Sequence, residues 1–233
     1  MKKSLLVLAL AAAFAPALAQ AEAGDWVVRL RAADVSPNED SRLGKTVNNL
    51  LGAPVMSPGA ELSVDNNWIP EFDVSYYFTK NIAAELILAL GTRHDVSIKG
   101  DSAGVVGNQN LGSVNLLPPT LTAQWHFNPD QMIDPYVGAG INYTNMLDRN
   151  LKGSSGAIAG NKIKIDSDSW GYVLQAGVDI NLKDGWLLNA DVKYATIDTD
   201  VKLNGAVTGG AWKKIDSLDI DPWVIGIGIG KKF

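Results

Sequence analysis

The sequence of 233 residues contains no cysteine, so backbone pairing and side-chain packing, rather than disulfides, must hold the fold together. Beyond its N-terminal region it also lacks any run of about eighteen apolar residues, which excludes helical membrane spans there. The formal net charge is -5, and this mildly acidic balance argues against a nucleic-acid partner. A soluble domain and a membrane barrel remain, because a closed barrel satisfies every backbone group in lipid without helices.

The first residues have the three parts of an export signal. Lys2 and Lys3 give a positive start, residues 5–14 form an apolar stretch too short to cross a bilayer, and small residues follow at Ala19 and Ala21. We therefore expect residues 1–21 to be a secretory signal peptide that is removed, and residues 22–233 to form the mature domain. Cleavage after Ala21 and cleavage after Ala19 both fit the pattern.

The end of the chain alternates strictly between bulky apolar and small residues. In an extended strand, Trp223 and the isoleucines that follow it share one face, and Gly226, Gly228 and Gly230 share the other. An apolar face of this kind, closing on the aromatic Phe233, is typical of a barrel strand that meets lipid.

The same period-two alternation recurs along the chain and predicts eight strands. The predicted strands are residues 26–35, 68–78, 82–95, 116–127, 133–147, 170–182, 186–202 and 218–233. Short connections alternate with long ones, and the long ones are residues 36–67, 96–115, 148–169 and 203–217. The sequence therefore predicts an all-β fold: an eight-stranded antiparallel up-and-down transmembrane β-barrel, with extracellular loops and short periplasmic turns.

Aromatic residues with outward parity recur near both ends of the predicted strands. Trp68 and Phe78 are ten residues apart, and a strand tilted by about 40° rises roughly 25 Å over that length, the height of the apolar band of a barrel. We predict that two aromatic girdles mark the membrane interfaces. Their residues are Trp26, Trp68, Phe78, Trp125, Phe127, Trp170, Trp186, Tyr194, Trp223 and Phe233.

Four motifs together resemble the OmpW family of small outer-membrane barrels. They are LPPTLTAQW at residues 117–125, PYVGAGINYT at 135–144, SWG at 169–171 and DPW at 221–223, followed by the terminal Phe233. The resemblance implies an eight-stranded barrel in the outer membrane of a Gram-negative bacterium, with a hydrophobic channel for small apolar molecules. Its implied partners are outer-membrane lipids, small hydrophobic solutes and, through the C-terminal strand, the barrel-assembly machinery. Lys231 departs from the tyrosine or similar residue that the family usually carries there.

Inward parity collects charges of both signs in the predicted lumen, where they must pair or stay hydrated. The predicted network comprises Arg29, Arg31, Glu71, Asp73, Glu85, Arg93, Asp95, Asp179, Asp191 and Lys193. An eight-stranded barrel holds only its own side chains or one small ligand, so we expect no general aqueous pore. Whether this network plugs the lumen or lines a wet passage stays open.

Apolar residues with the same inward parity predict an apolar layer toward the loop rim. They are Val27, Ala33, Ile69, Ile87, Ala89 and Val173. Within this layer we expect the lumen to be narrowest at Ile87. Lys193, Val173 and Ile69 are the other candidates for this constriction.

Pro118 and Pro119 lie where a closed strand ladder expects backbone donors, which adjacent prolines cannot supply. One hypothesis is a lateral gap there, through which a hydrophobic molecule passes from the lumen to lipid. The alternative is that the strand simply begins after the prolines.

Residues suited to catalysis are sparse. The two histidines, His94 with outward parity near the loop rim and His126 with inward parity near the turn rim, form no Ser-His-Asp constellation or metal site. We therefore predict no enzyme activity, metal or cofactor. The remaining hypotheses are passive transport of small hydrophobic molecules and a non-conducting structural or surface role, with long loops that bind ligands, phage or bacteriocins.

Overall fold

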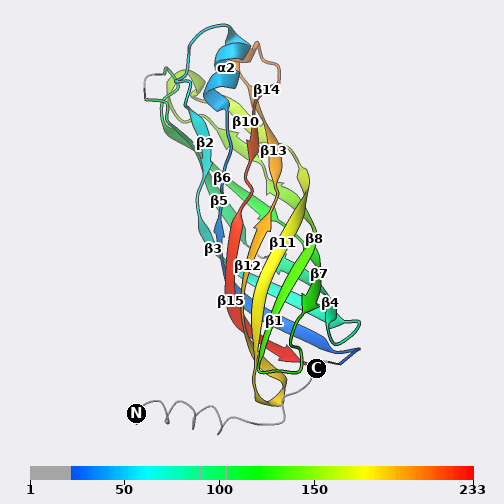
Figure 1. Ribbon diagram of the computed structural model, residues 1–233. Helices are drawn as coiled ribbons and strands as arrows, with labels where there is room; N and C mark the ends of the chain where they lie inside the picture. The colour runs from blue at the N-terminus through cyan, green and yellow to red at the C-terminus, as the bar shows by residue number, and fades with distance from the viewer. Residues whose placement is uncertain (1–21, 90, 103) are drawn as a thin grey trace, which may run out of the picture.

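The computed structural model describes residues 22–89, 91–102 and 104–233. The predicted signal peptide, residues 1–21, lies outside the described residues. Within the described ranges, no helix is long and apolar enough to cross a membrane. The chain forms an elongated cylinder of strands, with helix α2 (Leu43–Leu51) at one end and the C-terminus at the other (Figure 1).

Eight antiparallel strands close into a barrel, which confirms the predicted fold class. Each strand pairs with the next, and the β1–β15 pairing completes the circle. In order around the barrel they are β1 (Trp26–Ser36), β3 (Asn67–Tyr77), β4 (Ile82–Ala89), β7 (Thr120–His126), β8 (Ile133–Asp148), β11 (Asp168–Asn181), β12 (Trp186–Ala195) and β15 (Trp223–Lys232).

Glycines of β15 make room for two arginines of β1 inside the barrel. Arg29 lies opposite Gly230 and Arg31 lies opposite Gly228 in the β1–β15 register. A Cβ atom on Gly228 would lie 2.7 Å from Cγ of Arg31, and one on Gly230 would lie 2.8 Å from Cγ of Arg29. The alternation of isoleucine and glycine therefore serves two faces: the isoleucines cover the outside, and the glycines admit bulky charged side chains inside.

The aromatic residues predicted to mark the membrane interfaces lie on the outer face. Nine of the ten are exposed and Tyr194 is half-buried. Near the end that carries α2, the ring of Tyr194 lies 5.0 Å from that of Trp223. Near the opposite end, Trp26 lies 4.9 Å from Tyr76. Their role as membrane girdles stays a prediction.

Beyond the barrel, the chain continues into a folded extension, so the prediction of long loops is wrong for much of their length. Three strands continue the barrel sheet past β8, and four form a second sheet in the order β14, β13, β10, β9. The alternation persists because Leu62, Ile163 and Val201 continue an apolar inner face. The elements of the extension are β2 (Glu61–Val64), β5 (Thr92–Lys99), β6 (Gln109–Leu117), β9 (Asn150–Lys152), β10 (Lys162–Ile165), β13 (Asp198–Asn204), β14 (Lys213–Asp219) and the short 3-10 helices η1 (Gly156–Ile158) and η3 (Ala206–Thr208). A third 3-10 helix, η2 (Lys183–Gly185), forms the short turn between β11 and β12 at the other end of the barrel.

Four predicted strands are each interrupted where the barrel meets the extension, as β4/β5, β7/β6, β12/β13 and β15/β14. The break between β4 and β5 reverses the facing of the β5 side chains. Gly91 has a positive φ of 70°, and the residues after it face the opposite way from those of a continuous strand. Arg93 and Asp95 are therefore exposed and His94 is buried, so their predicted facings are wrong, and Arg93 does not belong to the lumen network.

Candidate functional site

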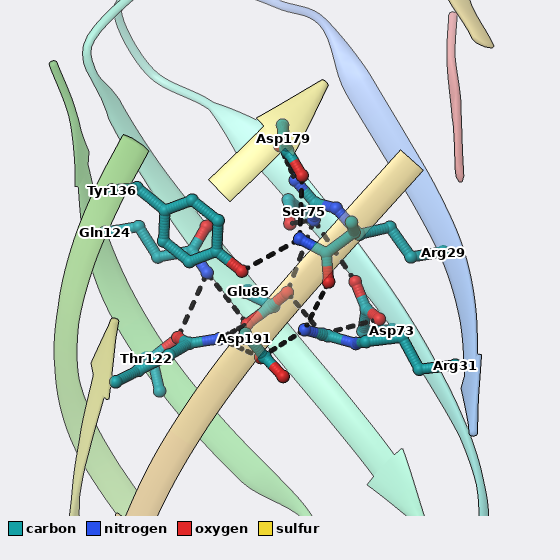
Figure 2. A network of polar contacts seen from close by, with 12 residues as sticks. Arg29, Arg31, Asp73, Ser75, Glu85, Thr122, Gln124, Tyr136, Asp179 and Asp191 are labelled. Atoms are coloured by element: carbon teal, nitrogen blue, oxygen red, sulfur yellow. Dashed lines mark hydrogen bonds and ion pairs between the residues drawn. The ribbon is translucent and has the colours of Figure 1, made fainter. Parts of the chain in front are cut away.

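Eight charged side chains from five barrel strands meet in the lower lumen in one network, here called the polar plug. None of them is more than 5% exposed. Figure 2 shows the two β1 arginines reaching across the lumen toward Glu85. The plug comprises Arg29 and Arg31 of β1, Glu71 and Asp73 of β3, Glu85 of β4, Asp179 of β11, and Asp191 and Lys193 of β12.

Glu85 receives bonds from opposite sides of the barrel. Its Oε1 accepts from Nη2 of Arg31 at 2.8 Å and lies 3.3 Å from Nη1 of Arg29. Its Oε2 accepts from the amides of Gln124 at 2.8 Å and Gln175 at 2.9 Å. Because one carboxylate joins β1, β7 and β11 across the lumen, the plug links the walls instead of lining a passage between them.

The arginines reach further carboxylates around the barrel. Arg29 pairs with Asp179 at 2.6 Å and with Asp73 at 3.2 Å. Arg31 pairs with Asp73 at 2.6 Å, and its Nη1 also binds Asp191. Buried charges are stable only when paired in this way, so removing one partner leaves the others buried with less compensating charge.

Lys193 and Glu71 form the upper boundary of the polar plug. Nζ of Lys193 lies 2.9 Å from Oε1 of Glu71 and 2.9 Å from Oδ2 of Asp191. The same Glu71 oxygen is 2.9 Å from Nε of Arg31. Lys193 and Glu71 also line the hollow above, so this ion pair is its floor.

Above this floor lies a hollow with almost entirely apolar walls, here called the apolar cavity. It spans about 1080 Å³ including its open parts, and it runs from the barrel into the extension. Aliphatic residues of the barrel wall and of the extension strands share it, among them Ile69, Val173, Val64, Leu116, Ile165 and Val201. An enclosed apolar wall binds an apolar molecule by removing its surface from water.

A second apolar hollow, of about 690 Å³ including its open parts, lies under helix α2. It shares Leu62 and Val201 with the apolar cavity, so the two are neighbours along the extension. Leu43 and Val47 of α2 are buried in its wall. Helix α2 therefore covers the outer end of the apolar interior (Figure 1).

The segment that leads to α2 is tied down by side chains. The backbone N–H of Val64 donates to the Glu39 carboxylate at 2.6 Å, and that of Leu62 donates to the Ser41 hydroxyl at 2.8 Å. Ser41 in turn donates to Asp216 at 2.5 Å. Burial raises the pKa of the Asp216 carboxyl, and the bond from Ser41 opposes that shift. These contacts satisfy free donors of β2, a strand at the end of the sheet order.

The ladder between the β4/β5 and β7/β6 segments is interrupted beside the two prolines. Pairing stops at Ile87 opposite Thr120 and resumes at Thr92 opposite Leu116. No pairing of the described residues crosses the wall between these points, here called the ladder interruption. On its other side the wall holds, because the Pro119 carbonyl accepts from the N–H of Tyr143 at 3.0 Å.

The apolar cavity reaches this ladder interruption from within. Residues on both sides of it line the cavity. They are Ile87, Ala89 and Thr92 on one side and Leu116, Pro118 and Thr120 on the other. The interruption thus combines missing backbone bonds with an apolar inner surface.

The four candidate constriction residues all line the apolar cavity, but not all of the predicted apolar layer does. Ile69, Ile87, Val173 and Lys193 are each at most 4% exposed. Val27 instead packs with a separate cluster of Tyr77, Ala83 and Leu187. Its predicted place toward the loop rim is wrong because Val27 precedes the plug arginines on β1, on the side of the short turns.

The two histidines occupy different environments. Nδ1 of His94 is 2.8 Å from the Asp65 carbonyl oxygen, and the ring lines the apolar cavity, a place that outward parity did not suggest. Near the short turns, Nδ1 of His126 is 2.7 Å from Asp134. His126, Asp134 and Asp179 together form a group whose ligand atoms could hold a metal, but Asp179 already pairs with Arg29.

Sequence reasoning misses most of the apolar cavity because its upper wall comes from segments predicted as loops. The signal was present but short: buried residues alternate at Leu62 and Val64, and again at Ile163 and Ile165. Segments of four residues are too brief to distinguish a strand from a loop with scattered aliphatic residues.

Comparison with known proteins agrees with this architecture. The OmpW family model matches residues 22–233. The chain is 36% identical over 236 residues to outer membrane protein W of Vibrio cholerae serotype O1, covering 100% of both. The crystal structure of OprG from Pseudomonas aeruginosa has a TM-score of 0.75 at 30% identity, covering 92% of this chain and 98% of that one. AlkL in lipid bilayers has a TM-score of 0.64 at 27% identity, covering 92% of each. The chain therefore belongs to the OmpW family and is a β-barrel of the Gram-negative outer membrane.

Proposed function

We propose that this barrel passively admits small hydrophobic molecules from outside the cell into the apolar cavity and releases them sideways into the membrane near Pro118 and Pro119. One observation carries the proposal. The apolar cavity has the polar plug as its floor and the ladder interruption in its wall. A molecule that enters from the extracellular end therefore meets a closed floor and a weakened wall.

The two exits differ in what a solute must disrupt. To continue toward the periplasm, it must separate buried ion pairs such as Lys193 and Glu71, and breaking one such pair costs about 3–5 kcal/mol. To leave sideways, it passes between Ile87 and Pro118, where no backbone bond of the described residues has to break. An apolar solute also gains no hydrogen bonds in the plug. Lateral release is therefore the easier route.

Within the apolar cavity, the proposed constriction consists of Ile69, Ile87, Val173 and Lys193. Ile87 is the last residue of β4 to pair with β7, so the same side chain borders the floor region and the exit. Replacing Ile87 with Ala would widen the passage at this point. We expect faster uptake of bulky apolar solutes in that variant.

The exit is tested by replacing both prolines. In Pro118→Thr/Pro119→Thr, the restored N–H group of residue 118 can pair across the ladder interruption, while that of residue 119 faces Tyr143 on the other side. Uptake of an apolar fluorescent probe by cells that produce the variant should therefore fall severalfold. Pro37→Thr/Pro222→Thr is the matched control, because these prolines also line the apolar cavity but lie away from the interruption. Wild-type uptake in the Pro118/Pro119 variant would exclude this exit.

A second function, surface interaction without transport, is favoured by the folded extension. Two sheets and α2 present a rigid extracellular surface of the kind that ligands, phage or bacteriocins can bind. We also expect the C-terminal strand to be recognised by the barrel-assembly machinery, since Phe233 is 70% exposed at its end. The two functions can be tested separately. Closing the proposed exit with Pro118→Thr/Pro119→Thr should lower uptake and leave the binding of ligands to the extension unchanged.

A further inference from the structure

The second extracellular sheet concentrates lysines on its outer face. In the register of this sheet, Lys162 lies directly opposite Lys152, Lys164 opposite Lys202, and Lys202 opposite Lys214. Their neighbours Leu151, Ile163 and Val201 face the buried interior, so these lysines face outward. We call the five lysines the lysine face.

Like charges directly opposite each other destabilise a sheet, because facing Cβ atoms are only about 4.5–5.5 Å apart. Two of the lysines are partly neutralised: Lys202 pairs with Asp166 and Lys214 pairs with Asp200, each at 2.5 Å. No ion pair with Lys152 or Lys162 occurs in the described part of the chain. The lysine face thus keeps an excess of positive charge on a protein whose formal net charge is -5.

An exposed aromatic ring accompanies these charges. Trp212 is 42% exposed, and Nζ of Lys164 lies 4.2 Å from the centroid of its ring. The flat ring offers an apolar surface to one face of a sugar, while the lysines offer donors to phosphate oxygens. The combination fits a ligand that carries phosphate on a saccharide better than a bare anion.

The height of the lysine face above the membrane points to the source of that ligand. Lys164 precedes Trp170, an exposed aromatic of the barrel wall, by six residues. Lys164 lies on β10 and Trp170 on β11, so at the rise and tilt of barrel strands this separation is at most roughly 15 Å beyond the apolar band. At this height the phosphorylated saccharides of outer-leaflet glycolipid surround the barrel.

We propose that the lysine face binds the phosphorylated saccharide headgroup of the glycolipid in the surrounding outer leaflet. Bound phosphate offsets the repulsion between the facing lysines, and Trp212 contacts the sugar. The site lies on the outer face and is independent of the proposed transport function. It fixes the extension in the headgroup layer and gives the barrel a preferred lipid neighbour.

The test uses the folded barrel in zwitterionic detergent, titrated with purified phosphorylated lipopolysaccharide of the short-chain type. We expect Lys152→Gln/Lys162→Gln/Lys164→Gln to weaken binding by about tenfold or more, since a basic residue near an anionic surface contributes roughly a factor of five. The control Lys45→Gln/Lys99→Gln/Lys183→Gln changes the charge equally at exposed lysines elsewhere and should stay within twofold of wild type. The variant Lys152→Arg/Lys162→Arg/Lys164→Arg keeps the positive charge and should retain binding.

Three results would overturn the proposal: unchanged affinity in the glutamine triple, an equal loss in the control, or equally tight binding of dephosphorylated lipopolysaccharide. A preference for the soluble, delipidated phosphosaccharide would also contradict it, because the source would then not be the membrane. Folding is followed separately by heat-modifiable gel migration. If the triple variant does not fold, Lys162→Gln alone is measured, with a loss of about fivefold expected and no loss contradicting the proposal.

Discussion

Arg31 illustrates how much of the fold depends on one buried side chain. It contacts Glu71, Asp73, Glu85 and Asp191, and it is only 2% exposed. Those carboxylates come from three strands, β3, β4 and β12. Without the guanidinium they would face one another with less compensating charge.

Replacing Arg31 with Met keeps the volume but removes the charge, and we expect it to lower the free energy of unfolding by about 3–5 kcal/mol. Urea unfolding of the barrel in lipid vesicles, followed by tryptophan fluorescence, measures this change. Lys183→Met, at an exposed position of the short turn η2, is the control and should change stability by less than about 0.5 kcal/mol. A loss below about 1 kcal/mol in Arg31→Met would show that the plug charges are hydrated and not paired.

The reversed parity of β5 makes a second prediction for single residues. The chain has no cysteine, so a single introduced thiol reports its own surroundings. We expect Arg93→Cys to react rapidly with a water-soluble maleimide on intact cells, and His94→Cys, at a site 3% exposed, to react at least tenfold more slowly. Equal rates, or the opposite order, would mean that the strand continues through Gly91 without a change of parity.

Among the elements, α2 is held in place by a close backbone approach. Gly44 donates its N–H to the Ala60 carbonyl at 2.9 Å, and a Cβ atom there would collide with the Ser57 carbonyl oxygen. Because backbone cannot yield as a flexible side chain can, a methyl group must displace the helix.

We therefore expect Gly44→Ala to loosen α2 over the second hollow. Limited proteolysis of the folded barrel should cut residues 43–60 severalfold faster than in wild type. Gly59→Ala is the matched control in the same segment, since no atom lies within 4 Å of the Cβ position there. Similar cleavage rates in both variants would contradict the contact that holds α2.

The elements also show what the sequence can and cannot predict. Most of the barrel strands are predictable because ten or more residues alternate against lipid, as in β15 and β11. The plug charges follow from the same parity. The prediction for Arg93 fails because parity holds only within an unbroken strand, and the strand is broken between Ala89 and Thr92, where Gly91 has a positive φ.

The extension was also not predictable from the sequence, and the reason is different. Its strands are short, and β2 and β10 have only four residues each. They are ordered by contacts between distant segments, such as the bond from Leu62 to Ser41 and the sharing of one cavity by Leu62 and Val201. The periodic signal of such short strands is too brief to identify them, so the upper cavity and the helix that covers it emerge only in three dimensions.

At the scale of the whole molecule, the interior of the barrel consists of two compartments. The lower lumen is filled by the polar plug, and the upper lumen continues into the apolar cavity of the extension. This division predicts that an apolar solute and an ion behave differently. The polar plug opposes the passage of both, and the proposed exit at the ladder interruption would serve only a molecule that dissolves in lipid.

The most direct measurement joins the two sides of the ladder interruption. Ala89 and Pro118 both line the apolar cavity, and they would be opposite each other if the register of Ile87 and Thr120 continued. In Ala89→Cys/Pro118→Cys, we predict that oxidation, or a short bis-thiol reagent, reduces uptake of an apolar probe to the level of cells without the protein. Reduction of the disulfide should return uptake to the level of the Pro118→Cys single variant, which carries the same restored N–H group. Uptake that is the same with the thiols joined and with them free would contradict lateral release.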